Sequence, residues 1–305
     1  MTIRFPEQRT VGQDPTIVHT RPIVVRQTSD RDVIVRPQVR IGPLLVDDLS
    51  QAMAVDAILE GARSVARKRA WIGYALHVGG LNERNDADYV QAMAKADCVY
   101  ADGMSVVMLA RLAGGRRVER TSTTDIGSDV LRRMGDELGR PVRVALVGGP
   151  DGLARAALDV LEAEAGVVGV AAEHGYHDDW TPLLARLALS ECDVLLVGLG
   201  APNEMKWVER HRDRLPPCVV LTCGGWFGFL VEEEIRAPRW MRQAGLEWAF
   251  RLAQAPRRLA RRYAVGLVST SGFAVLLCLQ RVFAPAAISD RRDYATAASS
   301  GPPRS

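Results

Sequence analysis

The sequence contains few cysteines and none in the spacing typical of metal or redox centres. Its 305 residues include five cysteines, at positions 98, 192, 218, 223 and 278, with no CxxC pair. Three of the five lie within apolar runs, as expected for buried thiols in a reducing compartment. The sequence therefore predicts neither a bound metal nor a cofactor.

The first twenty residues lack the apolar core of a secretory signal and contain Arg4, Glu7, Arg9 and Asp14. We therefore expect a cytoplasmic protein. One later segment, residues 264–280 (AVGLVSTSGFAVLLCLQ), carries no charge over seventeen residues. That length is at the short limit for a membrane span, and the segment contains Ser, Thr and Gly. We expect a buried or interfacial helix instead.

Net charge is only +3, with 48% hydrophobic and 25% charged residues, so composition indicates one large α/β domain with extensions and no particular partner. The distribution of charge is more informative. Between Arg236 and Arg262 there are eight arginines and a single acid, Glu247. This density suits a phosphate-bearing ligand, a nucleic acid or an anionic membrane surface.

Apolar runs alternate with helical patterns along the middle of the chain. The runs predict strands buried on both faces at Trp71–His77, Cys98–Tyr100, Val142–Val147, Val167–Ala172, Val194–Leu199 and Val219–Cys223. The intervening patterns predict helices at Leu49–Lys68, Ala87–Ala96, Val106–Ala113, Ile126–Leu138, Gly152–Ala163, Thr181–Ser190 and Asn203–Arg214. This alternation is typical of an α/β fold, with a Rossmann-like, mostly parallel sheet wrapped by helices.

Four segments follow from this organisation. We expect residues 1–40 to be disordered or extended, with a brief strand at Pro22–Arg26, and residues 41–235 to form the α/β core. Residues 236–288 form a basic, arginine-rich helical appendage, amphipathic and suited to associate with a membrane. Residues 289–305 form a disordered tail.

Three of the expected strands end in glycine-rich turns that lead into helices. The turns contain Gly148, Gly149 and Gly152; Gly198 and Gly200; and Gly224 and Gly225. In open α/β sheets ligands bind at the carboxyl ends of strands, where glycine permits close approach and a helix N-terminus offers N–H groups to phosphate. None of the turns matches a dinucleotide fingerprint or a Walker A loop, and each alone is equally explained by architecture. Three in one sheet predict a nucleotide pocket without naming the nucleotide.

Asp102 follows a short apolar strand and precedes Gly103 and a helical run. This position suits a catalytic carboxylate and, equally, an N-cap of the next helix. Arg116, Arg117 and Arg120 follow downstream. They are candidates to bind phosphate, because a guanidinium group can donate to two phosphate oxygens at once. They are equally explained as part of a solvated loop.

Other polar residues carry weaker signals. Asp86 and Asp88 spell the D-x-D pattern of metal-dependent sugar transferases, but they open a helix, so capping is the better interpretation. Asp125 also precedes a helix, and we interpret it as a cap. His77 ends an apolar strand. It is either a histidine of the core or a residue that faces the crevice.

Three stretches carry a resemblance to a known family: ADGMSVVMLARLAGGRRVERTSTTDI (101–126), LLVGLGAPNEMKWVERHRDRLP (195–216) and RAPRWMRQAGLEWAFRLAQAPRRLARRYAVG (236–266). They resemble the WecG/TagA/CpsF glycosyltransferases (glycosyltransferase family 26). The resemblance covers about residues 42–268, and its last third is highly specific.

The resemblance implies an inverting, metal-independent enzyme of exopolysaccharide or cell-envelope glycan assembly. Such an enzyme moves a sugar from a nucleotide donor, typically UDP-linked, to a saccharide on a polyprenyl diphosphate. Asp102 matches the proposed general base of the family. The appendage matches a region associated with the membrane, which implies a peripheral position at the inner face of the plasma membrane.

Together with the glycine turns, the resemblance assigns residues to the two substrates. The donor residues are Gly103, Gly148, Gly149, Gly198, Gly200, Pro202, Asn203, Glu204, Lys206, Gly224 and Gly225. The acceptor or diphosphate residues are His77, Arg120, Arg236, Arg239, Arg257, Arg258 and Arg261.

The chain departs from the family pattern at three places that border the expected pocket. Ala75-Leu76-His77 replaces Thr-x-Asn, Glu204-Met205 replaces Gln-Glu, and Gly228 replaces an Asp. These changes motivate an alternative, a non-catalytic partner that binds a nucleotide or a lipid-linked sugar. Aromatic residues interleave with the arginines of the appendage, which favours an anionic membrane over nucleic acid. The oligomeric state stays open, a homo-oligomer included.

Overall fold

The structure is a computed structural model that describes residues 36–64, 69–233, 235–238, 240–241 and 245–283. The expected N-terminal extension up to residue 35, its strand at Pro22–Arg26 and the expected tail at 289–305 lie outside these residues. Two sheets are present in the described residues, a six-stranded sheet in the order β4-β3-β8-β7-β5-β6 and a separate two-stranded hairpin of β1 and β2.

All neighbouring strands of the six-stranded sheet are parallel. The predicted mostly parallel α/β sheet is therefore confirmed, and the expected strand boundaries are correct to within two residues. The strands are β3 (Trp71–Leu76), β4 (Cys98–Ala101), β5 (Arg143–Gly148), β6 (Val168–Glu173), β7 (Val194–Gly198) and β8 (Val219–Thr222).

The inner strands are continuous apolar runs because helices cover both faces of the sheet. In β3, β7 and β8 nearly every residue is buried. Strand β6 is different. It lies at the edge of the sheet, its residues are partly exposed, and Val168 is 46% exposed, so the expectation that β6 is buried on both faces is wrong.

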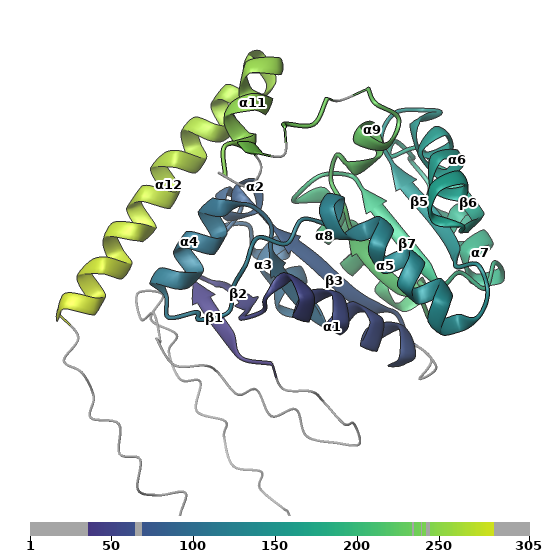
Figure 1. Ribbon diagram of the computed structural model, residues 1–305, viewed down its shortest axis with the longest axis horizontal. Coiled ribbons are helices and arrows are strands. Elements are labelled where there is room, and N and C mark those ends of the chain that lie inside the picture. The colour runs from purple at the N-terminus through teal and green to yellow at the C-terminus, as the bar shows by residue number, and fades with distance from the viewer. Residues whose placement is uncertain (1–35, 65–68, 234, 239, 242–244, 284–305) are drawn as a thin grey trace, which may run out of the picture.

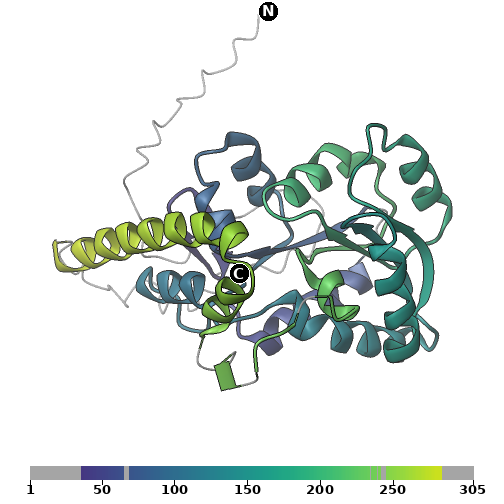
Figure 2. The same ribbon diagram turned by 90° about the horizontal axis from the view of Figure 1, so that it is seen from above.

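Two helical layers enclose the sheet (Figure 1; Figure 2). Side chains of α1, α5, α6 and α9 pack in the core on one face, and those of α2, α3, α4, α7 and α8 pack on the other. The helices are α1 (Gln51–Ser64), α2 (Val78–Asn82), α3 (Ala87–Ala94), α4 (Met104–Leu112), α5 (Thr123–Leu138), α6 (Leu153–Ala165), α7 (Thr181–Leu189), α8 (Asn203–His211) and α9 (Trp226–Leu230).

The β1–β2 hairpin (Gln38–Ile41 and Leu44–Asp47) begins three residues before the expected start of the core. Its Ile41, Leu44 and Val46 are fully buried beneath the outer edge of the sheet. The Asp47 carboxylate accepts a hydrogen bond from the Val99 amide of edge strand β4, at 2.6 Å. The hairpin therefore covers an edge that would otherwise expose unpaired backbone groups.

The C-terminal appendage contains α11 (Glu247–Gln254) and the long helix α12 (Pro256–Phe283), which runs down the side of the domain (Figure 1). Gly266 lets α12 approach Val78 of α2, and Gly42 in the β1–β2 turn packs against Phe273. The guanidinium of Arg84 lies 5.3 Å from the Phe273 ring centroid. One face of α12 is thus fixed to the core.

The opposite face of α12 is exposed and apolar, with Leu267 at 70% and Val268 at 75% exposure. The expectation of a buried helix at 264–280 is therefore wrong, while an interfacial position stays a prediction. By length and composition alone, Leu259–Leu279 could also cross a membrane.

We predict that Gly148 is required for the close approach of β5 and β7. Gly148 has a φ of +145°, and an alanine Cβ there would lie 2.2 Å from the Gly198 carbonyl oxygen. Gly148→Ala should lower the free energy of unfolding by more than about 3 kcal/mol, because neither backbone can move away. Urea unfolding measures this loss.

Gly139 provides the matched control, since it caps α5 at a φ of +64° with open space around it. Gly139→Ala should cost only about 1 kcal/mol. Equal losses for the two variants would contradict the steric explanation.

Candidate active site

Because the six strands are parallel, their carboxyl ends lie along one edge of the sheet. The residues that follow each strand therefore gather there: His77 after β3, Asp102 after β4, and the three glycine turns after β5, β7 and β8. Open space faces the Cα of Gly103, Gly200 and Gly224, where an added Cβ would meet nothing within 4 Å. Space is therefore open at these three glycines, along the edge where the sequence predicts a ligand crevice.

Asp102 is held at the end of β4 by a hydrogen bond from its amide to the Leu76 carbonyl, 2.7 Å long. Gly103, with a φ of +100°, is the N-cap residue of α4. The carboxylate of Asp102 is therefore not the helix cap, which removes the architectural alternative for this residue. Its side chain is half-buried.

Burial raises the pKa of the Asp102 carboxyl from its ordinary 3.8 to about 6. Arg120 and a hydrogen bond from Ser122 lower the pKa, whereas the negative charges of Glu247 and Asp125 raise it. A carboxyl with this pKa is mostly ionised at neutral pH and is basic enough to accept a proton from an alcohol in a transition state.

An ion-pair network joins the core to the appendage next to Asp102. Arg120 pairs with Asp125 and, at 3.3 Å, with Glu247 of α11. Arg236 pairs with the same Asp125 at 2.7 Å and donates to the Thr124 carbonyl at 3.4 Å. The interpretation of Asp125 as a helix cap is wrong, because the N-cap position of α5 belongs to the residue at 122 and Asp125 binds the two arginines.

Of the arginines assigned to the acceptor, Arg120 and Arg236 therefore meet beside the candidate base. Arg257 and Arg261 are exposed on the first turns of α12. Arg239 lies outside the described residues, as does the side chain of Arg258. The assignment of Arg239, Arg257, Arg258 and Arg261 to the acceptor thus stays a prediction.

His77 is the N-cap of α2, where its Nδ1 accepts a hydrogen bond from the Gly79 amide at 3.0 Å. This bond requires an unprotonated Nδ1, so in the neutral ring the hydrogen sits on Nε2. His77 follows β3, the strand next to Asp102, and therefore lies at the same end of the sheet. Asp86 caps α3 through the Tyr89 amide, which confirms the capping interpretation of the D-x-D pattern.

Glu204 is only 1% exposed, although it was expected at the donor. Its Oε2 accepts hydrogen bonds from the Gly200 amide at 3.1 Å and the Gly224 amide at 3.2 Å. Glu204 therefore ties the turns after β7 and β8 to each other, and these two amides are already engaged by the protein. A phosphate that binds at this edge must therefore be held by groups other than the Gly200 and Gly224 amides.

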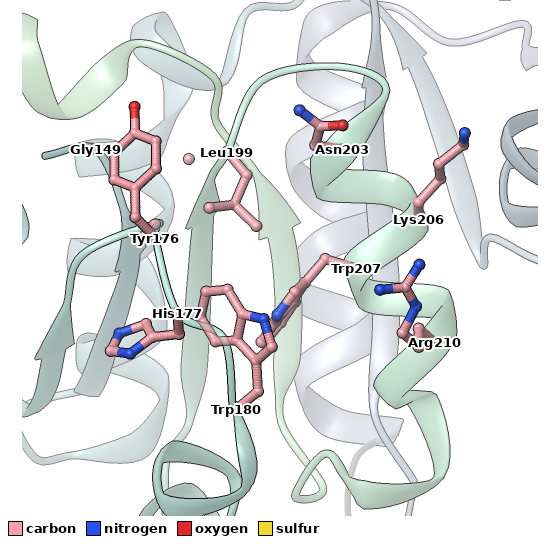
Figure 3. Close-up of a pocket in the computed structure, with 11 residues that line it drawn as sticks. Gly149, Tyr176, His177, Trp180, Leu199, Asn203, Lys206, Trp207 and Arg210 are labelled. Carbon is pink, nitrogen blue, oxygen red and sulfur yellow. The ribbon is translucent and has the colours of Figure 1, made fainter.

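Beside these turns lies an open cavity of about 460 Å³ (Figure 3). Four of the predicted donor residues line it: Gly149, Gly198, Asn203 and Lys206. The predicted Gly148, Gly200, Pro202, Gly224 and Gly225 lie at the ends of β5, β7 and β8 but are not among its lining residues. The predicted Gly103 follows β4 and lies away from the cavity. The cavity thus unites the turns after β5 and β7.

The aromatic and cationic wall of this cavity was not predicted from the sequence. Tyr176, His177, Trp180, Trp207 and Arg210 also line it (Figure 3). Trp180 packs edge-on against both His177 and Trp207, with centroid distances of 4.8 and 5.2 Å. The signal was the aromatic run in HGYHDDW after β6, which the strand pattern alone does not connect to α8.

The cavity and Asp102 lie along the same edge but are not adjacent. Three strand spacings separate β7 from β4 in the sheet order, roughly 14 Å.

Lys206 lies on the cavity wall and pairs with Asp86. In the described part of the chain, no three His, Cys, Asp or Glu side chains gather in a way that could hold a metal ion.

The sequence is similar to a known family and to a characterised bacterial enzyme. The sequence model of the glycosyl transferase WecG/TagA/CpsF family matches residues 39–286. An N-acetylglucosaminyldiphosphoundecaprenol N-acetyl-beta-D-mannosaminyltransferase of Bacillus subtilis (strain 168) is 28% identical over 181 residues. That similarity covers 59% of this chain and 70% of the relative.

We predict that Asp102→Asn stabilises the fold at neutral and alkaline pH. Because the folded-state pKa is raised to about 6, the ionised carboxyl destabilises the folded protein above pH 6. The gain from Asn should be on the order of 1–3 kcal/mol at pH 8. It should fall as the pH drops through 6 and vanish near the ordinary Asp pKa. Urea unfolding of both proteins from pH 4 to pH 8 measures the difference.

Asp179 provides a control of opposite sign, since the Thr181 amide lowers the pKa of its carboxyl. Asp179→Asn should lose stability at neutral pH and recover relative to wild type only in acid. A pH-independent effect of Asp102→Asn would contradict the environment described for Asp102.

Proposed function

Since the chain belongs to the glycosyl transferase WecG/TagA/CpsF family, we propose that it moves a sugar from a UDP-linked donor to a saccharide on a polyprenyl diphosphate. The Bacillus subtilis relative is named for such an acceptor, N-acetylglucosaminyldiphosphoundecaprenol. The observation that carries the proposal is the position of Asp102, a half-buried carboxylate on the same sheet edge as a cavity of nucleotide size. The product would be a lipid-linked saccharide longer by one sugar, formed in the assembly of an exopolysaccharide or cell-envelope glycan.

The donor nucleoside is proposed to occupy the cavity between β5 and β7. Tyr176 and Trp180 supply aromatic surface for a base, and Gly149 and Gly198 let the ligand approach the backbone. Lys206 and Arg210 supply positive charge at the cavity wall for the diphosphate. From there an extended nucleoside diphosphate follows the strand ends toward β4, over roughly the three strand spacings that separate the cavity from Asp102.

Asp102 is proposed to act as general base in a single displacement with inversion. The acceptor hydroxyl oxygen forms a bond to the anomeric carbon while the bond from that carbon to the β-phosphate oxygen breaks. The bonding electron pair leaves with the nucleoside diphosphate, and the hydroxyl proton passes to the Asp102 carboxylate. A positioned base contributes roughly a hundredfold to ten-thousandfold in rate.

The acceptor diphosphate is proposed to approach from the side of the appendage. Arg120 and Arg236 are both oriented by Asp125 beside the base, so their guanidinium groups offer positive charge there. His77 lies at the next strand end as a further donor through Nε2. Arg257 and Arg261 continue the positive charge along α12.

The lipid part of the acceptor requires a membrane, and the exposed apolar face of α12 is proposed to meet it. Met104 and Met108 of α4, the helix that follows Asp102, are also exposed, as is Trp248 of α11. Because the other face of α12 is packed on the core, a helix lying in the interface is favoured over one that crosses the bilayer. The protein would then be peripheral at the cytoplasmic face.

Asp102→Asn should keep the fold and lose at least a hundredfold in kcat, because the amide cannot accept the proton. The donor is first identified by screening UDP- and GDP-sugars for protection against thermal unfolding, since a bound ligand stabilises the folded state. Turnover is then measured as release of nucleoside diphosphate with a polyprenyl-diphosphate-linked N-acetylglucosamine acceptor.

Asp159→Asn, at an exposed acid on α6 that pairs with Arg155, is the control and should keep wild-type turnover. Retained donor binding by Asp102→Asn separates a catalytic from a structural defect. Equal turnover by Asp102→Asn and wild type would exclude Asp102 as the base. Donor binding without transfer by the wild-type protein would favour a non-catalytic binding partner.

The double variant Leu267→Glu/Val268→Glu should bind vesicles containing phosphatidylglycerol at least tenfold more weakly than wild type, because it places two charges on the apolar face of α12. Co-sedimentation with vesicles measures binding. Leu189→Glu, at an apolar residue of α7 that is 85% exposed, is the matched control and should bind normally. Equal binding by all three proteins would contradict a membrane role for this face.

A further inference from the structure

The loop between α4 and α5 is folded around a carboxylate from a distant part of the chain. Oδ1 of Asp48, at the end of the β1–β2 hairpin, accepts hydrogen bonds from the Arg116 amide at 3.0 Å, the Arg117 amide at 2.7 Å and the Val118 amide at 3.0 Å. Its Oδ2 accepts from the Arg116 amide at 3.1 Å. Three consecutive N–H groups thus converge on one acid.

Consecutive amides that point to one centre form an anion-binding nest, and charge-assisted bonds to such a nest are strong. Asp48 is only 8% exposed, so its carboxylate is solvated by these amide hydrogen bonds in place of water. Gly114, at a φ of +105°, allows the required turn. The side chains of Arg116 and Arg117 are exposed. Their backbone amides are already bound to the Asp48 carboxylate of the protein.

Two further contacts extend this anchorage toward the candidate base. The Glu119 amide donates to the Leu49 carbonyl at 3.1 Å, and the Thr121 amide donates to the Ala101 carbonyl at 2.7 Å. Arg120 lies between these two fixed residues. The Arg120 guanidinium therefore contacts Asp125 and Glu247 from a segment whose backbone is hydrogen-bonded on both sides.

We propose that Asp48 is a positioning residue, which holds the 114–121 loop in the conformation that presents Arg120 to Asp102. Asp48 does not touch the substrates; it acts through the loop. The inference rests on the proposed function for its catalytic meaning, because Asp102 is the proposed base. The geometric part, the placement of Arg120, is testable without any substrate.

The substrate-free test uses the charges that face Asp102. These are Arg120 from the loop, Glu247 from α11 and Asp125 from α5, together with the Ser122 hydroxyl. Arg120 is the cation of this set and lowers the pKa of Asp102. Displacing Arg120 should therefore raise the pH at which Asp102 titrates.

The measurement compares each background with and without the Asp102→Asn substitution, as the difference in the free energy of unfolding from pH 4 to pH 9. In Asp48→Ala the midpoint of this difference should rise by about one pH unit relative to wild type. Arg120→Gln should raise it by a similar amount. The double variant Asp48→Ala/Arg120→Gln should show no further rise, because both changes remove the same charge.

Asp48→Asn keeps one acceptor oxygen for the nest and is the variant to use if Asp48→Ala does not fold; it should shift the midpoint by less than Arg120→Gln. Asp56→Ala, at an exposed acid on α1, is the control and should leave the midpoint in place. A uniform loss of stability in Asp48→Ala with an unchanged midpoint would mean a purely structural role and would overturn the proposal. So would additive shifts in the double variant.

Kinetics then separate this proposal from the proposed function. With the donor found by the thermal screen, Asp48→Ala should lose about tenfold or more in kcat and shift the acid limb of the pH profile upward. If Asp102→Asn keeps full turnover, the proposed function fails, yet the midpoint measurement still decides whether Asp48 places Arg120. If Asp102→Asn is inactive and Asp48→Ala has a wild-type profile, only the role of Asp48 fails.

Discussion

The five ladders of the central sheet are all parallel, and this constraint determines where the polar residues of the chain can meet. A parallel sheet sends every strand in the same direction, so residues far apart in the sequence emerge at one edge. Asp102 after β4 and the turn after β7 share that edge for this reason. Close contact of backbones at Gly148 and Gly198, and the Glu204 carboxylate between two turns, then fix its shape.

The appendage is part of this arrangement because its charges complete the surroundings of Asp102. Arg236 reaches Asp125, and Glu247 reaches Arg120, so the segment after the α/β core closes over the end of β4. Helix α12 then runs from this network along the domain, with one face packed and the other apolar and exposed. The surroundings of Asp102 and the exposed apolar face of α12 are thereby linked through a few ion pairs, as the proposed lipid-linked acceptor would require.

Sequence patterns predicted the sheet well because long apolar runs such as those of β5 and β7 have few alternatives when helices cover both faces. The hairpin was missed because its strands are four residues long and mix charge with apolar residues. Helix α2 was missed because its five residues include Gly79 and Gly80, and only the cap at His77 supports it.

For the candidate site, the sequence indicated where its residues lie in the sheet but only some of the contacts that they make. Strand ends identified Asp102 and the glycine turns, but no local signal shows that Glu204 turns inward to bind two amides. Likewise, the bonds from the 116–118 amides to Asp48 join segments about seventy residues apart, and periodicity does not report such contacts.

The most direct test of the proposed donor arrangement is a crystal structure of the protein with UDP bound. The nucleoside should lie in the cavity lined by Gly149, Tyr176 and Lys206, with the β-phosphate directed along the strand ends toward Asp102. A UDP molecule bound away from the carboxyl edge of the sheet, or with its diphosphate directed away from β4, would contradict it.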